Sequence, residues 1–320
     1  EWGSKMRWII TCLLFTAAAE LSADTYNFRV GDEVVGNVGV YVLKENDNFL
    51  ALAQELRVGF NELVEANRSV DPWIPEAGER IIIPTRYVLP NVKQNGVVVN
   101  LAELRLYYFH PAEPGSDMRA VSTYPISVGK SDQWGTPLAE TKIIGKRAKP
   151  NWYPPKSIRA EHEAKNDPLP AVVPAGPDNP LGDYALRLQL AGYLIHGTNV
   201  PEGIGMRVTH GCIRMHPKGI ERLFSEVKVN TPVQIINQPY KVGWLKNKLY
   251  IESHAEIEEY QKAASKNLTQ FVKAVVKQTS DQQAYQVDMD WEEGYAQARN
   301  KRGIPFSIAT RQLTAAVETE

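Results

Sequence analysis

Residues 193–217, which read YLIHGTNVPEGIGMRVTHGCIRMHP, contain the side chains best suited to chemistry. A cysteine nucleophile needs an imidazole within hydrogen-bond reach, a third group that orients this imidazole, and donors for the oxyanion. His196 ends an expected strand, and Cys212 lies in a loop that returns past that strand end. We therefore predict nucleophilic catalysis by Cys212, with His196 as its base.

The residues beside Cys212 suit the other requirements of this chemistry. Gly211 lets the backbone approach a substrate carbonyl closely, and the amides of Gly211 and Cys212 could point at the developing oxyanion. A free thiol has a pKa of roughly 8.5, and a neighbouring imidazolium lowers it by about one to several units. We therefore expect a Cys212 thiolate at neutral pH.

A metal site is the alternative chemistry, because the segment holds His196, His210 and His216. Their spacing matches neither HExxH nor CxxC, and Glu202 is the one acidic residue near Cys212. We predict no metal and no cofactor. A structural role is the alternative for His210 and His216. No role is assigned to the isolated histidines His110, His162 and His254.

The composition of the 320 residues is that of an ordinary globular protein, with 43% hydrophobic and 23% charged residues. These fractions exclude disordered, collagen-like and coiled-coil proteins. The formal net charge is −1. A protein that neutralises many phosphates is strongly basic, so nucleic acid is not a predicted partner. The length allows two or three domains.

Residues 1–23 are predicted to be a secretory signal peptide. Lys5 and Arg7 give a positive start, and residues 8–19 are an apolar run that precedes a small-residue cleavage point. This run is shorter than the roughly 20 residues of a transmembrane helix; a buried N-terminal helix is the alternative. Cleavage leaves Cys212 as the single cysteine in an oxidising compartment, either as a reactive thiol or as an inert buried one.

Residues 41–84 are expected to form a small α+β module. A short strand, two helices separated by Gly59 and a closing strand ended by Pro84 follow one another. The strings YVLKENDNFLALA, ELVEAN, and DPW followed by ERIIIP resemble the LysM module, a wall-sugar binding domain. The resemblance implies that loops 45–48 and 71–74 hold N-acetylglucosamine; a packing module without a ligand is the alternative.

From residue 97 the hydrophobic period changes to two, which predicts strands. The expected strands are 97–100, 103–109, 121–128, 185–190, 193–196 and 233–236, with a helix at 219–227. Because little helix intervenes, we predict a mainly β, antiparallel architecture for residues 95–237 rather than a βαβ fold.

Residues 150–180 contain eight prolines in 31 residues and cannot join central strands. A loop of this length inside a compact domain is usually functional or disordered. Trp152 and Tyr153 stand just before Pro154-Pro155 and offer large apolar faces on a stiffened backbone. We predict a lid or substrate wall; a surface insertion without function is the alternative.

Residues 238–320 are predicted to form a partly helical extension. Apolar residues recur at steps of three or four over 257–275, which is typical of an amphipathic helix. Trp291 and Tyr295 indicate a second helix that ends near Gly303. We expect this helical tail to pack on the β domain.

The motif HGT, followed after about a dozen residues by THGCIR, resembles the active-site signature of the L,D-transpeptidases, or YkuD domain. The likeness spans residues 95–237 and implies a β-sandwich-like catalytic fold. With the signal peptide, the LysM-like module, the WYPP and PDNPLG segments and the tail, the chain is similar to the Gram-negative periplasmic branch of ErfK/YbiS/YcfS/YnhG type. A periplasmic location is therefore expected.

The resemblance implies acyl transfer in the cell wall. Cys212 would attack the bond between meso-diaminopimelate and the terminal D-alanine of a peptidoglycan tetrapeptide stem, form a thioester and release D-alanine. His196 corresponds to the base, and the Gly197 carbonyl to the group that orients its ring. His210 and Gly211 correspond to the region that lines the oxyanion site.

The substrate-binding residues are expected around this centre. Arg214 matches a residue that grips a substrate carboxylate, which suits its planar guanidinium. The other predicted substrate-binding residues are Thr209, Asn199, Trp152 and Tyr153. Thr209 stands where many members have serine, and both residues carry a hydroxyl.

Three acceptors are compatible with the thioester: the lysine of an outer-membrane lipoprotein, which we favour, the diaminopimelate of another stem, and water. A carbapenem is the expected covalent inhibitor. A non-catalytic wall-binding protein with a vestigial cysteine site is an alternative from another class. A papain-like thiol hydrolase is a third, although it places the cysteine before the histidine, whereas Cys212 follows His196 here.

Overall fold

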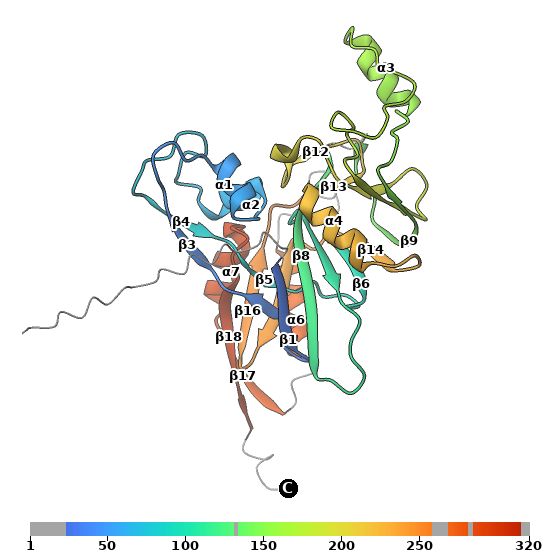
Figure 1. The fold of residues 1–320 in the computed structure, drawn as a ribbon. Coiled ribbons are helices and arrows are strands. Elements are labelled where there is room, and N and C mark those ends of the chain that lie inside the picture. The colour runs from blue at the N-terminus through green and yellow to red at the C-terminus, as the bar shows by residue number, and fades with distance from the viewer. Residues whose placement is uncertain (1–23, 131–133, 258–267, 281–283, 315–320) are drawn as a thin grey trace, which may run out of the picture.

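The computed structural model describes residues 24–130, 134–257, 268–280 and 284–314 (Figure 1). The predicted signal peptide, residues 1–23, lies outside the described residues. Within the described ranges, no helix is long and apolar enough to cross a membrane. Strands predominate over helices there, which confirms the mainly β prediction.

The largest sheet has ten strands, in the order β1-β8-β13-β11-β10-β9-β14-β6-β7, with β12 paired to β8. Because β7 also pairs with β8, the strands from β8 round to β7 close into a barrel-like ring, called the barrel below. The ten strands are β1 (Asp24–Arg29), β6 (Gly96–Asn100), β7 (Arg105–Phe109), β8 (Met118–Gly129), β9 (Ala139–Ala148), β10 (Tyr184–Leu188), β11 (Leu194–His196), β12 (Arg207–Thr209), β13 (Ile213–Met215) and β14 (Pro232–Ile236). The strands expected from the period of two correspond to β6, β7, β8, β10, β11 and β14.

Two strand pairs in the barrel depart from the antiparallel prediction. β11 pairs with β13 in parallel, and so does β14 with β6. A parallel pair requires a crossover of about a dozen or more residues. The chain between β11 and β13 supplies one, through a short 3-10 helix η2 (Pro201–Gly203) and β12. The crossover returns the chain so that Cys212, just before β13, lies beside β11.

The barrel interior is a single apolar core to which strands on all sides contribute. The side chains that are completely shielded from solvent include Val97, Val99, Leu106, Ile126, Ile143, Leu186, Ile195, Ile213 and Val233. The helix α4 (Pro217–Glu226), predicted at 219–227, adds Ile220 and Leu223 to this core. Burial of each such side chain contributes roughly 1.5–3 kcal/mol, so the core fixes the strand ends that carry the chemistry.

The N-terminal module has the strand, helix, helix, strand order expected for residues 41–84. Its elements are β3 (Gly39–Val42), α1 (Phe49–Glu55), α2 (Phe60–Ala66) and β4 (Arg80–Ile83), and β3 pairs with β4 in antiparallel fashion. Asn48 caps α1, because its Oδ1 accepts a hydrogen bond from the Ala51 amide at 2.9 Å. A separate apolar core that includes Phe49, Leu52 and Leu63 holds the module together.

The module is fastened to the barrel by backbone and side-chain contacts. The Phe60 amide donates to the carbonyl oxygen of Ile204 at 3.3 Å. Glu62 of α2 accepts a hydrogen bond from Arg105 Nε at 3.0 Å, and both side chains are buried. Glu62 also accepts from the Gly59 amide at 2.8 Å, so one carboxylate caps α2 and joins the module to β7.

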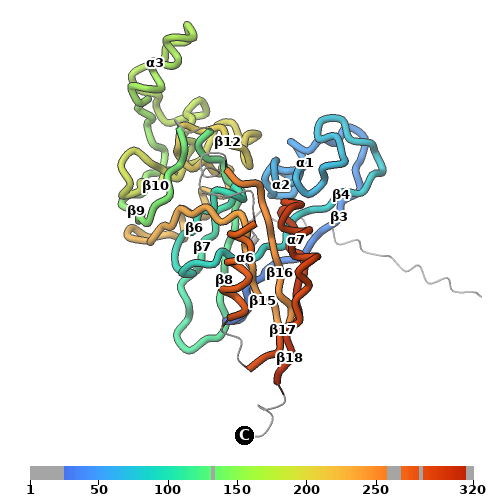
Figure 2. Tube along the Cα trace, turned by 180° about the vertical axis from the view of Figure 1, so that it is seen from behind, coloured from blue at the N-terminus to red at the C-terminus, as the bar shows by residue number. Residues whose placement is uncertain are grey.

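The C-terminal extension contains a sheet that the sequence did not predict. Its strands are β15 (Tyr240–Leu245), β16 (Lys248–Ser253), β17 (Tyr285–Met289) and β18 (Phe306–Leu313), in the order β15-β16-β18-β17. The helices α6 (Thr269–Thr279) and α7 (Trp291–Asn300) lie over this sheet (Figure 2). Residues 258–267 of the first predicted helix lie outside the described residues. A remaining pair, β2 (Val34–Gly36) and β5 (Arg86–Val88), lies beside β15 and β16.

The proline-rich stretch 150–180 folds back on itself rather than running as a simple loop. The backbones of Trp152 and Val173 exchange two hydrogen bonds of 2.8 Å. The buried Asn179 closes the base, since its Nδ2 donates to the Pro150 carbonyl at 2.8 Å. Between these ties, a helix α3 (Lys156–Ala164) projects beyond the barrel end near β12 (Figure 1). This helix was not predicted.

Candidate active site

The parallel pair β11–β13 places the predicted nucleophile and base on one wall. Ile195 is opposite Ile213 and His196 is opposite Arg214, so Cys212 is level with Leu194. Cys212 and His196 both line one cavity. Trp152, Tyr153, Thr209, His210 and Arg214 also line this cavity, here called the thiol cavity. Asn199, predicted to bind substrate, is exposed and does not line it.

His196 is held as a neutral base. Its side chain is buried, and its Nδ1 lies 2.7 Å from the carbonyl oxygen of Gly197. A carbonyl can only accept, so Nδ1 carries the proton, and Nε2 of the neutral ring has a free lone pair. Burial, and then the positive charge of Arg214, lower the pKa of His196 to about 4, despite the opposing bond to Gly197. The imidazole is therefore uncharged at neutral pH.

Cys212 is a neutral thiol in this structure. Burial raises the pKa of the Cys212 thiol; a hydrogen bond from the Leu194 amide and the charge of Arg214 oppose this less strongly. The sulfur lies 3.7 Å from the carbonyl oxygen of Gly192. The expected resting thiolate is therefore wrong, because the His196 ring that was to stabilise it is not an imidazolium. The pair is thiol and imidazole, and the proton must move during the reaction.

Arg214 adds a positively charged side chain to the lining of the thiol cavity. It follows Cys212 by two residues, on β13. Its Nε atom is buried and has no hydrogen-bond partner among the described residues. A buried donor without a partner costs about 1–3 kcal/mol, so the position of this atom calls for an explanation. The Arg214 residue lines the cavity that Cys212 also lines.

The loop before β13 is shaped by hydroxyl groups. Gly211 has φ +102, a conformation that favours glycine. Thr209 Oγ1 donates to the Cys212 carbonyl at 2.6 Å and accepts from the Gly211 amide at 3.2 Å. Thr136 Oγ1 donates to the Gly211 carbonyl at 2.7 Å. These bonds fix the backbone that presents the sulfur.

Two predicted roles change because of these bonds. The Gly211 amide was expected to face the oxyanion, but it donates to Thr209 Oγ1. Thr209 was expected to bind substrate, but its buried hydroxyl bonds within the loop. Both residues shape the loop that carries Cys212. Of the two amides predicted to face the oxyanion, that of Cys212 is the one left as a candidate.

His210, predicted to line the oxyanion site, contacts α3. Its Nε2 lies 2.7 Å from Glu161 Oε2, on α3. Trp134 packs edge-on against its ring, with centroids 4.9 Å apart. The same carboxylate group lies 3.5 Å from Lys130 Nζ. Sequence reasoning missed Glu161 and Lys130, because Glu161 is 49 residues from His210 in the chain and α3 interrupts a stretch dominated by proline.

The lid aromatics lie where the sequence predicted a wall. Trp152 and Tyr153 line the thiol cavity together with Ile158 of α3. Trp152 is half-buried and tied to Val173, whereas Tyr153 is 66% exposed. Apolar surface that is left open next to a nucleophile is suited to contact with a substrate.

The three histidines of the metal alternative each have a different hydrogen-bond partner. His196 bonds Gly197, His210 bonds Glu161, and His216 caps α4 by accepting from the Lys218 amide at 3.3 Å. The structural alternative therefore describes His216.

Elsewhere in the described residues, Glu103, Glu252 and His254 have a metal-like arrangement and are all buried. Lys241 Nζ lies among them, 2.6 Å from Glu103 and 2.9 Å from Glu252. His254, to which no role was assigned, lies 2.7 Å from Glu252. An ammonium group has no lone pair for a metal and already supplies the positive charge, so this cluster is an ionic joint between the barrel and the C-terminal sheet.

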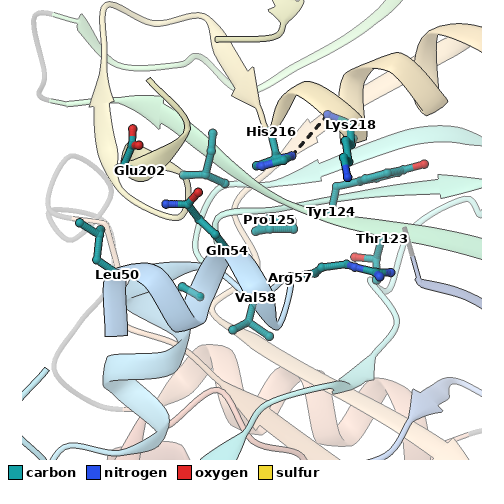
Figure 3. A pocket seen from close by; sticks show the side chains of 13 residues that line it. Leu50, Gln54, Arg57, Val58, Thr123, Tyr124, Pro125, Glu202, His216 and Lys218 are labelled. Atoms are coloured by element: carbon teal, nitrogen blue, oxygen red, sulfur yellow. Dashed lines mark hydrogen bonds between the residues drawn. The ribbon is translucent and has the colours of Figure 1, made fainter. Parts of the chain in front are cut away.

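A second cavity lies between α1 and the barrel (Figure 3). Leu50 and Gln54 of α1 line it from one side, and Pro125 and His216 line it from the other. None of the predicted site residues lines it. Cys212 precedes β13 and His216 follows it, so the two cavities lie at opposite ends of one short strand.

Comparisons with known proteins agree on one family. Residues 94–235 match the L,D-transpeptidase catalytic domain, YkuD. The chain is 43% identical over 246 residues to the probable L,D-transpeptidase YcfS of Escherichia coli (strain K12), covering 74% of this chain and 75% of that protein. It is 37% identical over 298 residues to the probable L,D-transpeptidase YbiS of the same organism, covering 90% and 92%. It is 36% identical over 231 residues to the probable L,D-transpeptidase ErfK/SrfK of that strain, covering 72% of this chain and 73% of that protein.

Proposed function

The chain belongs to the YkuD family of L,D-transpeptidases, and from this premise we propose that it moves peptidoglycan stem peptides through a thioester on Cys212. The observation that carries the proposal is the pairing, in one cavity, of a half-buried thiol with an imidazole whose Nδ1 is fixed by Gly197. This arrangement leaves Nε2 as the proton acceptor that a neutral thiol needs.

The first half-reaction builds the thioester. Cys212 Sγ attacks the carbonyl carbon between diaminopimelate and the terminal D-alanine while its proton passes to His196 Nε2. The tetrahedral intermediate collapses, the C–N bond breaks, and His196 returns the proton to the leaving amine of D-alanine. A base with a pKa of about 4 is a weak proton acceptor, so its protonated form is a strong acid for the leaving amine.

The second half-reaction releases the acyl group to an amine. The acceptor nitrogen attacks the thioester, His196 takes its proton, and the C–S bond breaks. The departing sulfur recovers the proton, which restores the neutral pair. We propose the lysine amine of an outer-membrane lipoprotein as acceptor, with diaminopimelate of another stem or water as the alternatives. The setting is the periplasm, reached after removal of residues 1–23.

Arg214 and the lid aromatics would hold the donor stem. We assign the unpartnered Nε of Arg214 to an oxygen of the stem, either a carboxylate or the carbonyl that becomes the oxyanion. A guanidinium is suited to either, because it donates in a rigid fork. Trp152 and Tyr153 would cover the apolar part of the peptide.

The N-terminal module would bind the glycan strand as a LysM domain. Trp73, in the predicted sugar loop 71–74, is 59% exposed and packs on Phe60 at 5.5 Å between ring centroids. Asp71 Oδ1 accepts hydrogen bonds from the amides of Trp73 and Ile74 at 2.8 and 3.1 Å, which stiffens the loop. A rigid, exposed indole is a suitable stacking surface for a sugar ring.

The proposal is tested by trapping the acyl-enzyme. Incubation with a carbapenem or with a disaccharide tetrapeptide, followed by intact mass measurement, should show a covalent adduct on the wild type. Cys212→Ala should show none, and His196→Gln should form it far more slowly. An adduct of equal yield on Cys212→Ala, or no adduct on the wild type, would overturn the mechanism.

A non-catalytic wall-binding protein predicts a different result. In that case the wild type would sediment with isolated sacculi but release no D-alanine from them. Under our proposal, Cys212→Ala should keep sacculus binding while D-alanine release stops.

A further inference from the structure

The helix α3 borders the thiol cavity and projects beyond the barrel end (Figure 1). None of its residues is buried, and Ile158 is its one residue that lines the cavity. A helix of nine residues without a buried face does not hold its position by packing. Its place over the cavity therefore depends on polar contacts.

In the described part of the chain, the polar side-chain contacts from α3 to the barrel converge on one carboxylate. Glu161 Oε2 lies 2.7 Å from His210 Nε2, and Glu161 Oε1 lies 3.5 Å from Lys130 Nζ. Lys165, at the C-terminal end of α3, contacts the same carboxylate at 2.8 Å. Hydrogen bonds from Lys165 and then His210 lower the pKa of Glu161 to about 2, so the group is ionised.

The barrel partners of Glu161 belong to the segments that shape the nucleophile. His210 is two residues before Cys212, and Lys130 directly follows β8. The Lys130 amide donates to the Thr209 carbonyl at 3.1 Å. The contact at Glu161 therefore connects the lid to both sides of the loop that presents the sulfur.

We propose that Glu161 is a positioning residue for the donor: through His210 and Lys130 it holds α3 closed over the thiol cavity, so that a stem peptide is bound between the lid and Cys212. The inference rests on the proposed function for its substrate, but the closed lid itself does not. Loss of the contact should let α3 move away, which exposes the thiol to small reagents and weakens binding of the donor peptide.

The test is Glu161→Gln, with Glu163→Gln as the matched control, because Glu163 is exposed on the same helix. The first readout is the rate of Cys212 alkylation by iodoacetamide without donor, with the adduct located by peptide mapping. The second is KM and kcat for a disaccharide tetrapeptide. Because this ion pair is open to solvent, its loss should have a moderate effect: Glu161→Gln should raise both the alkylation rate and KM about two- to fivefold, with kcat nearly unchanged. Glu163→Gln should match the wild type.

His210→Gln gives a reciprocal test. It should reproduce the faster alkylation, and the double variant should be no faster than Glu161→Gln alone, because that substitution already disrupts the contact with His210. The proposal is overturned if Glu161→Gln leaves alkylation and KM at wild-type values, or if it lowers kcat alone. If the wild type and the variants all fail to turn over the tetrapeptide while Glu161→Gln is still alkylated faster, that result would refute the proposed function but support the closed position of α3.

Discussion

His196 and Arg214 stand directly opposite each other on the parallel strands β11 and β13, and Cys212 lines the same cavity as both. The guanidinium charge helps to keep the imidazole unprotonated, since it adds to the effect of burial. The same charge favours the anion on sulfur. One arginine therefore biases both partners toward the state in which the base is free and the developing thiolate is stabilised.

The pH dependence of acylation should reflect this arrangement. His196 must be neutral to accept the thiol proton, and its pKa of about 4 means that it is neutral at every pH above that value. We expect kcat/KM for the donor to stay level from neutral pH down to about pH 5 and to fall as pH approaches 4. The measurement is kcat/KM against pH for a tetrapeptide. An acidic limb near the ordinary histidine value of about 6.5 would contradict the buried neutral base.

Replacement of both lid aromatics should affect binding rather than folding. Trp152→Ala/Tyr153→Ala removes the apolar wall of the thiol cavity, while the barrel core remains intact. We expect KM for the donor to rise or turnover to fall, with the thermal midpoint shifted by no more than about a few degrees. Steady-state kinetics and a melting curve measure both. Loss of the folded state would instead mean that the two rings support the fold.

The ionic joint at Lys241 should be important for stability. Lys241→Met leaves Glu103 and Glu252 buried without the ammonium group that lies between them. Breaking a buried ion pair by removal of one partner costs about 3–5 kcal/mol. Denaturant unfolding at neutral pH should show a loss of that order. Lys248→Met, at an exposed position on β16, is the control and should stay within about 0.5 kcal/mol of the wild type.

A substitution in the N-terminal module should weaken binding to sacculi without changing the reaction of Cys212 with a soluble peptide. Trp73→Ala should weaken sedimentation with intact sacculi, because it removes the exposed indole of loop 71–74. It should leave kcat/KM for a soluble tetrapeptide unchanged, since Trp73 does not line the thiol cavity. Val40→Ala, an exposed substitution on β3, serves as the control for both assays. Unchanged sacculus binding by Trp73→Ala would argue against glycan contact at this loop.

The sequence was informative where residue type alone determines chemistry. The spacing of His196 and Cys212 in the HGT and THGCIR motifs was enough to propose the nucleophile and its base, and the period of two predicted strands of the barrel. The spacing could not predict the charge state of the pair. That state depends on burial and on Arg214 opposite His196, and burial is a property of the assembled barrel.

The missed features have different causes. β15 reads YKVGWL, in which Tyr240, Val242 and Trp244 alternate with Lys241 and Gly243, so a strand signal was present in the sequence and the helical prediction for the extension passed over it. Glu161 meets His210 only because Asn179 and Trp152 fold the proline-rich stretch back on itself. Contacts of this kind depend on tertiary folding over long sequence separations, and a local pattern does not encode them.

The double use of Glu62 has a consequence for how a wall polymer would be handled. Its carboxylate both caps α2 and pairs with the buried Arg105 of β7, so the small N-terminal unit is not carried on a loose tether. If a glycan strand were held at Trp73, the distance from the held sugar to Cys212 would be fixed. The stems presented to the sulfur would then be chosen by their spacing along the strand as well as by their peptide chemistry.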